Sequence, residues 1–143
     1  MKKIQFDTGI EEFALGGGVL RFNPGDPNLY ARFLETAEKI KDLEKSLVEQ
    51  AEKCDGSAEE LIRLMQKADM DMKQQLNHVF GQGNDFEALL QGVNLLAVAN
   101  NGERVVTNLF SALEPVLLQG AQRCAGEKKA EAVAKAKARR AAR

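Results

Sequence analysis

Apolar residues recur at three- and four-residue steps in the first half of the chain, the spacing of one face of an α-helix. The stripe consists of Leu29, Phe33, Ile40, Leu43 and Leu47, with Cys54 in register and Thr36 and Gln50 as weak points. Asp26 offers a side-chain oxygen to the free amides of a first turn, and Pro27 suits the first helical position. The pattern predicts a long helix that begins at Pro27 and buries a narrow seam against another helix.

A second stripe follows a break at Asp55-Gly56. Ser57 stands three residues before Glu60, the spacing of a capping box, so this helix is expected to begin at Ala58 and to end before Gly81. Its apolar positions are Leu61, Leu64, Met65, Ala68, Met72, Leu76, Val79 and Phe80. Because the connecting loop is short, we expect the second helix to fold back antiparallel on the first.

The N-terminal residues follow a two-residue alternation instead, which is typical of strands. Residues 3–7, 12–15 and 19–22 are three candidate strand pieces, and three glycines separate the last two. These glycines do not indicate a phosphate loop, because strand-like residues follow them where a helix would be needed. The pattern predicts a β-hairpin over residues 3–22, with an apolar face against the helices that consists of Phe6, Phe13, Leu15, Leu20 and Phe22.

The second half of the chain has weaker signals. Asn84 followed by Glu87 repeats the capping arrangement and predicts a short helix through Leu90. A broad apolar face then predicts a longer helix over residues 103–125. Pro115 lies inside that helix and is expected to kink or break it near Glu114.

These elements predict an α+β, mainly α fold: an N-terminal β-hairpin packed on an antiparallel helical bundle, with a basic C-terminal helical extension. A chain of 143 residues fits one domain, assigned to residues 1–126, with a tail at residues 127–143. The tail carries a charge of +5 and the preceding residues −6. Such a tail either attracts nucleic acid or acidic proteins, or keeps the chain soluble. The acidic body and the lack of interleaved aromatic residues favour the second role, so nucleic acid is not an expected partner.

The chain offers little material for catalysis. His78 is the only histidine and no Cys-x-x-Cys pair is present, which excludes the common zinc-site spacings. Asp69 and Asp71 are two residues apart on a predicted helix and point in different directions. We therefore expect no catalytic, cofactor-binding or metal-binding residues, and a protein that is not an enzyme.

Two further features bear on location. The two cysteines, Cys54 and Cys124, are far apart in helical patterns, which is typical of reduced core thiols. The apolar runs are too short to span a bilayer, and the first residues lack the apolar core of a signal peptide. A cytoplasmic protein without a membrane partner is expected.

Two stretches resemble the tail assembly chaperones of long-tailed bacteriophages and prophages. They are DTGIEEF…VLRFNPGDPNLYARF in residues 7–33 and VFGQGNDFEALLQGVN in residues 79–94. The most specific part consists of Asn23, Pro24, Asp26, Pro27 and Asn28. The resemblance implies transient binding of the tape measure protein and recruitment of tail tube protein in the cytoplasm of the bacterial host.

A chaperone of this kind would cover the apolar stripe of a helical client by helix-in-groove docking. The client or self-association surface is assigned to Met65, Met72, Leu109, Phe110 and Leu113, and a homo-oligomer is compatible with it. Two alternatives remain open. One is a virion structural or tail connector protein, which would be found in purified particles, and the other is a small nucleic-acid-binding regulator that uses the basic tail.

Overall fold

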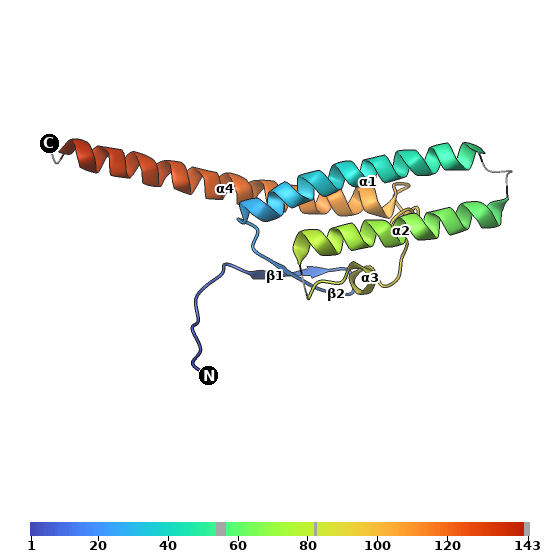
Figure 1. The fold of residues 1–143 in the computed structure, drawn as a ribbon, viewed down its shortest axis with the longest axis horizontal. Helices are drawn as coiled ribbons and strands as arrows, with labels where there is room; N and C mark the ends of the chain where they lie inside the picture. The colour runs from blue at the N-terminus through green and yellow to red at the C-terminus, as the bar shows by residue number, and fades with distance from the viewer. Residues whose placement is uncertain (54–56, 82, 142–143) are drawn as a thin grey trace.

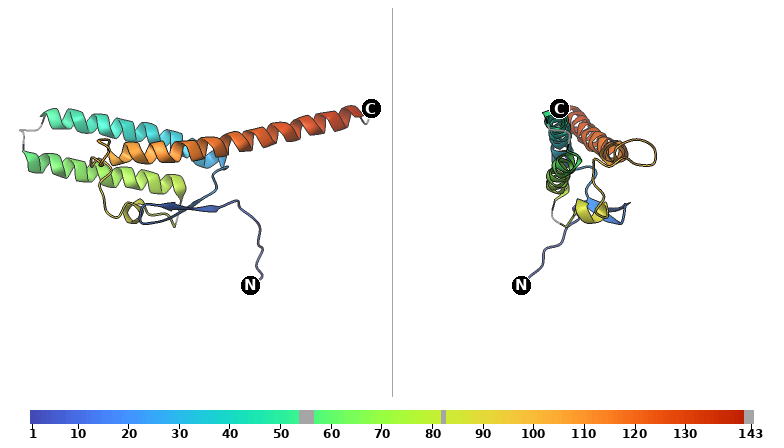
Figure 2. Two further views of the ribbon diagram at one scale, coloured as in Figure 1. Left: turned by 180° about the vertical axis from the view of Figure 1, so that it is seen from behind. Right: turned by 90° about the vertical axis from the view of Figure 1, so that its right-hand side faces the viewer.

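The computed structural model describes residues 1–53, 57–81 and 83–141, and Figure 1 shows their arrangement. The elements in order are β1 (Glu11–Leu15), β2 (Gly18–Phe22), α1 (Pro27–Lys53), α2 (Ala58–Phe80), α3 (Phe86–Leu89) and α4 (Val105–Ala141). Helices α1 and α2 pack side by side, α4 lies beside α1, and the hairpin with α3 lies against one side of these helices (Figures 1 and 2). The mainly helical α+β fold with an N-terminal hairpin is confirmed.

The hairpin is shorter than predicted. β1 and β2 pair antiparallel with Phe13 opposite Leu20 and Leu15 opposite Gly18, so Gly16 and Gly17 form the turn. The predicted strand at residues 3–7 is wrong, because no strand among the described residues pairs with this segment, and Ile4 is 90% and Phe6 79% exposed. Without a neighbouring strand, the alternating pattern has no surface on which to bury its apolar side chains.

An aromatic chain joins the hairpin to the helices. The ring of Phe13 stacks on Phe22 at 4.6 Å, and Phe22 meets the edge of Phe80 at 5.1 Å. Phe80, the last residue of α2, also contacts Phe86 of α3 with ring centroids 5.4 Å apart. The hairpin is therefore held by burial of its inner face, since a two-stranded sheet alone is marginal in water.

Helices α1 and α2 begin and end close to where the sequence predicts. Pro27 is the first residue of α1, and the Ser57 hydroxyl accepts a hydrogen bond from the Glu60 amide at the start of α2. Thr36, a weak point of the predicted seam, is 2% exposed and belongs to the buried face of α1. At the other end of α2, the Arg32 guanidinium donates two hydrogen bonds to the Val79 carbonyl. Cys54 lies outside the described residues.

Helix α4 differs most from its prediction. It runs unbroken from Val105 to Ala141, so the predicted break near Glu114 is wrong. The predicted basic helical extension is present, and it continues the same helix without an end near residue 125. Proline has no backbone N–H, so Pro115 cannot donate to the Ser111 carbonyl one turn earlier. Pro115 and Ser111 are both exposed, so the freed carbonyl lies on the hydrated side of the helix. Leu113 and Leu117 remain buried on either side of the proline, and this burial keeps the two halves of the helix continuous.

The core lies where α1, α2 and the first part of α4 meet above the hairpin. Its fully buried large side chains are Leu20, Ile40, Met72, Leu76, Val79, Phe86, Leu95, Leu96, Val106 and Leu117. Leu95 and Leu96 come from the loop between α3 and α4, so this loop is part of the core rather than a surface connection.

Candidate interaction surface

The predicted client surface is largely core. Met72, Leu109 and Leu113 are 0%, 6% and 5% exposed, so in the folded chain they are not available to a client. Met65 and Phe110 are half-buried and pack against the core. The Phe110 ring meets the edge of Phe33 with centroids 5.5 Å apart, which joins α4 to α1. The assignment of the three buried residues is corrected, because periodicity identifies a buried face without saying what covers it.

The motif at residues 23–28, which carries the resemblance to tail assembly chaperones, has a structural role. The Asn23 carboxamide accepts from the Gly25 amide at 2.8 Å and donates to the Thr8 carbonyl at 2.9 Å. The Asp26 carboxylate accepts from the Asn28 amide, where α1 begins. Pro24 is buried, and its carbonyl lies directly against Gly120 of α4. These residues form the turn that sets the start of α1 against α4.

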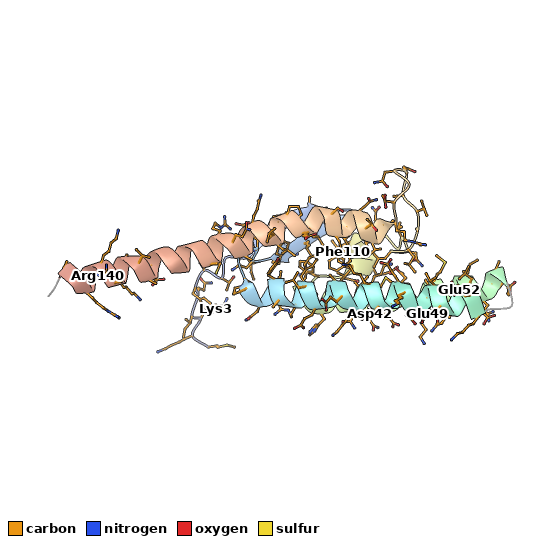
Figure 3. All side chains as sticks on the ribbon, turned by 90° about the horizontal axis from the view of Figure 1, so that it is seen from above. Lys3, Asp42, Glu49, Glu52, Phe110 and Arg140 are labelled. Atoms are coloured by element: carbon orange, nitrogen blue, oxygen red, sulfur yellow. The ribbon has the colours of Figure 1, made fainter. Side chains whose placement is uncertain are left out.

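A two-helix arm extends beyond α4. We define it as residues 41–53 of α1 and 58–67 of α2. The last buried residue of α1 is Ile40 and the first of α2 is Ala68, so no described residue of the arm is buried. Figure 3 shows Asp42, Glu49 and Glu52 on this part of α1, beyond Phe110 of α4.

Apolar side chains continue along the arm, some of them packed against the core and others exposed. Leu43, Leu47 and Met65 are half-buried against the end of the core. Val48 is 57%, Leu61 36% and Ile62 62% exposed. These exposed side chains come from both helices of the arm, and apolar surface that is left exposed can mark a protein interaction site. The arm is therefore the described surface best suited to bind another helix.

A buried ionic cluster escaped the sequence analysis. Lys73 is 3% exposed, and its ammonium lies 2.9 Å from the Asp69 carboxylate and 2.6 Å from the Glu87 carboxylate. The other oxygen of Asp69 accepts a hydrogen bond from the Leu95 amide at 2.8 Å. The sequence signal was an i, i+4 pair of opposite charges directly beside the buried positions of α2. The cluster attaches both α3 and the following loop to α2.

The pKa of Lys73 reflects this environment. Burial by itself lowers the pKa of the ammonium. The hydrogen bonds and the charge attraction from Glu87 and Asp69 raise it, and their combined effect is larger than that of burial. The net result is a pKa above the ordinary value of 10.5. Lys73 is thus held as a cation, and it serves as a structural charge rather than as a proton acceptor.

The cluster borders an open cleft of about 460 Å³. The cleft is lined by Gln66, Asp69, Met70, Lys73, Gln74, Asn77, Glu87, Gly92 and Asn94. Within residues 1–53, 57–81 and 83–141, no three His, Cys, Asp or Glu side chains gather closely enough to hold a metal ion. His78 is exposed, and Cys124 is a half-exposed free thiol rather than a core residue.

Comparisons with protein-family models, with curated proteins and with solved structures each gave no match. In the described part of the chain, no helix has the length and apolar character needed to cross a bilayer.

Proposed function

We propose that this chain is a phage tail assembly chaperone that binds the tape measure protein and helps to recruit tail tube subunits in the cytoplasm of the bacterial host. The observation that carries the proposal is the arm, which extends past the start of α4 and exposes Val48, Leu61 and Ile62. A client helix with its own apolar stripe would fit between the two helices of the arm by helix-in-groove docking.

The motif resemblance supports the same role. Its residues build the turn between hairpin and α1, and this turn positions α4 so that the arm is left uncovered. A tape measure protein is a long helical polypeptide, and covering its apolar face would keep it soluble until tube subunits replace the chaperone. In this proposal the chain acts by binding alone, without covalent chemistry.

Co-expression with tape measure fragments from the same tail gene cluster tests the proposal. The native chain is expected to move the fragments into the soluble fraction, and Ile62→Glu is expected to reduce that effect because it places a charge in the arm. Leu34→Glu is the matched control, since Leu34 is an exposed apolar residue of α1 outside the arm.

An unchanged insoluble fraction with the native chain would contradict the chaperone role. Recovery of the chain in purified phage particles at fixed stoichiometry would instead favour a virion connector protein.

A further inference from the structure

The two strands of the hairpin differ at their outer edges. Leu15 pairs with Gly18 across a two-residue turn, and in such a hairpin every second residue pair is joined by hydrogen bonds. Arg21 falls between two bonded pairs, so its amide and carbonyl point away from β1. The Asn84 carboxamide binds both groups, at 2.9 and 2.8 Å, and thereby closes the outer edge of β2.

The outer edge of β1 is open. Glu12 and Ala14 fall between the bonded pairs, so their amides and carbonyls point away from β2. Both residues are exposed, and no further strand of the described residues lies beside them. An unpaired edge of this kind is a template for another strand.

A cleft of about 480 Å³ lies beside this edge. Its walls come from β1, the turn before α1 and α4, and they include the apolar residues Phe13, Pro24 and Val116 and the charged residues Glu11 and Arg123. Glu11 and Phe13 share the inner face of β1, because alternate residues of a strand point to the same side. A strand added at the edge would therefore place its own inward side chains at this cleft.

Residues 1–6 have the pattern of a strand, and no strand of the described residues pairs with them. Ile4 and Phe6 are two residues apart, so they share one face of an extended chain. They are 90% and 79% exposed. The chain thus carries both an open sheet edge and an unpaired segment with two apolar side chains at strand spacing.

The start of the chain is directed away from its own hairpin edge. The Asn23 carboxamide, next to the end of β2, donates to the Thr8 carbonyl at 2.9 Å, and the Gly9 amide donates to the Asp7 carboxylate at 2.8 Å. From there residues 1–6 run outward past the end of the hairpin that is opposite its turn (Figures 1 and 2). While these contacts are present, the segment cannot lie along β1 of its own chain.

We propose that residues 2–6 of one copy add as an antiparallel strand to the open edge of β1 of a second copy, which returns the same contact. In the register that places Ile4 opposite Phe13, Phe6 lies opposite Glu11 at the cleft. Both apolar side chains then face inward, on the same side as Phe13. This inference depends on the chain alone and not on the proposed client.

The exchange has to be mutual to form a specific interface. A phenylalanine side chain buries about 150 to 250 Å², so two segments, each with one phenylalanine and one isoleucine, bury roughly 500 Å². The surfaces that receive them lose a similar area, and the total reaches the roughly 1,000 Å² that a specific interface needs. One exchanged segment would reach only half of that area. The expected assembly is therefore a twofold dimer.

Sedimentation of the purified full chain measures this association. The native chain is expected to pass from monomer to dimer as its concentration rises. Phe6→Ser is expected to raise the dissociation constant about 100-fold or more, because each dimer loses two buried rings. Leu34→Ser removes an exposed apolar side chain of α1 and is expected to leave the constant within about twofold. Circular dichroism confirms that each variant is folded.

A second pair of variants tests the main-chain contact. The Ala14 amide points to the open edge and not to β2, so Ala14→Pro removes a donor for the added strand while the ladder of the hairpin is kept. This change is expected to raise the dissociation constant about tenfold. Ala14→Val keeps the amide and is expected to change the constant by less than about twofold.

Disulfide trapping identifies the partner. In the proposed register Lys3 lies opposite Ala14 of the second copy, at a spacing that a disulfide can span. A K3C chain and an A14C chain, both with Cys54 and Cys124 replaced by serine, are expected to form a mixed disulfide dimer on oxidation. Leu34→Cys in place of A14C is the control and is expected to give no cross-link.

A native chain that stays monomeric up to its solubility limit would overturn the proposal, and so would equal effects of Phe6→Ser and Leu34→Ser. A K3C/A14C double variant that closes its disulfide within one chain would show that the segment folds back on its own β1, which also contradicts the exchange. Loss of client binding by an intact dimer would contradict only the proposed function.

Discussion

Gly120 of α4 lies so close to Pro24 that a methyl group on its Cα would overlap the Pro24 carbonyl oxygen. The absence of a side chain at this position allows the turn before α1 to contact the α4 backbone. This contact sets the offset of the two helices, and with it how far the arm extends beyond α4.

Replacing Gly120 by alanine is therefore expected to destabilise the chain, by about 1 to 3 kcal/mol, as overpacking does. Gly126 lies in the same helix with nothing within 4 Å of an added Cβ. At that position alanine is expected to stabilise the fold by about 0.5 to 1 kcal/mol through its helix propensity. Urea denaturation followed by circular dichroism measures both changes, and equal effects of the two substitutions would refute the contact.

Asn84 closes the outer edge of β2. Its carboxamide accepts from the Arg21 amide at 2.9 Å and donates to the carbonyls of Arg21 and Phe80 at 2.8 and 3.0 Å. The sequence had assigned Asn84 as the cap of α3, but Asp85 is the cap and accepts from the Glu87 amide. Asn84 instead takes the place of a third strand.

Asn84→Ala is expected to cost about 2 to 3 kcal/mol of unfolding free energy, because buried backbone groups lose their partners. Asn84→Asp keeps an acceptor for the Arg21 amide and loses both donated hydrogen bonds, so it is also expected to be destabilising. Asn108→Ala removes hydrogen bonds only to the exposed Asn101 and is expected to change the free energy by less than about 0.5 kcal/mol. Thermal and urea unfolding distinguish these cases. An Asn84→Ala protein as stable as the native chain would contradict the structural role of Asn84.

Lys73→Met is expected to cost about 3 kcal/mol or more, because Asp69 would then be a buried carboxylate without its cation. Glu87 contributes less to this loss, since its side chain is 58% exposed. Lys67→Met removes an exposed charge from the same helix and is the matched control. Similar denaturation midpoints for the two variants would show that the cluster does not stabilise the fold.

The Lys73 cluster also predicts a pH dependence. The pKa of Lys73 in the folded chain lies above 10.5, so its stabilising contribution is fully present below that pH and is lost as the pH rises through the folded pKa. The free-energy difference between the native chain and Lys73→Met is thus expected to be constant from pH 7 to pH 10 and to shrink above it. Parallel urea titrations at several alkaline pH values measure this difference; a decline starting near neutral pH would contradict the assignment.

Local chemistry was sufficient to predict several boundaries. A proline at the first helical position placed the start of α1, and Ser57 with Gly81 placed both ends of α2. The predictions failed where the outcome depended on distant neighbours. Ile4 and Phe6 have the alternation of a strand but no strand beside them, and Pro115 was tolerated because it lies on the exposed side of α4.

The sequence by itself determined the helical stripes, the hairpin turn and the separation of acidic and basic charge, because each depends on spacing along a few turns of chain. Only the tertiary structure decided which part of each stripe is covered. Met72 is buried while Leu61 is exposed, although both belong to the same apolar stripe of α2. The physical reason is the offset between α4 and the α1–α2 pair, which the contact of Gly120 with Pro24 sets across almost a hundred residues.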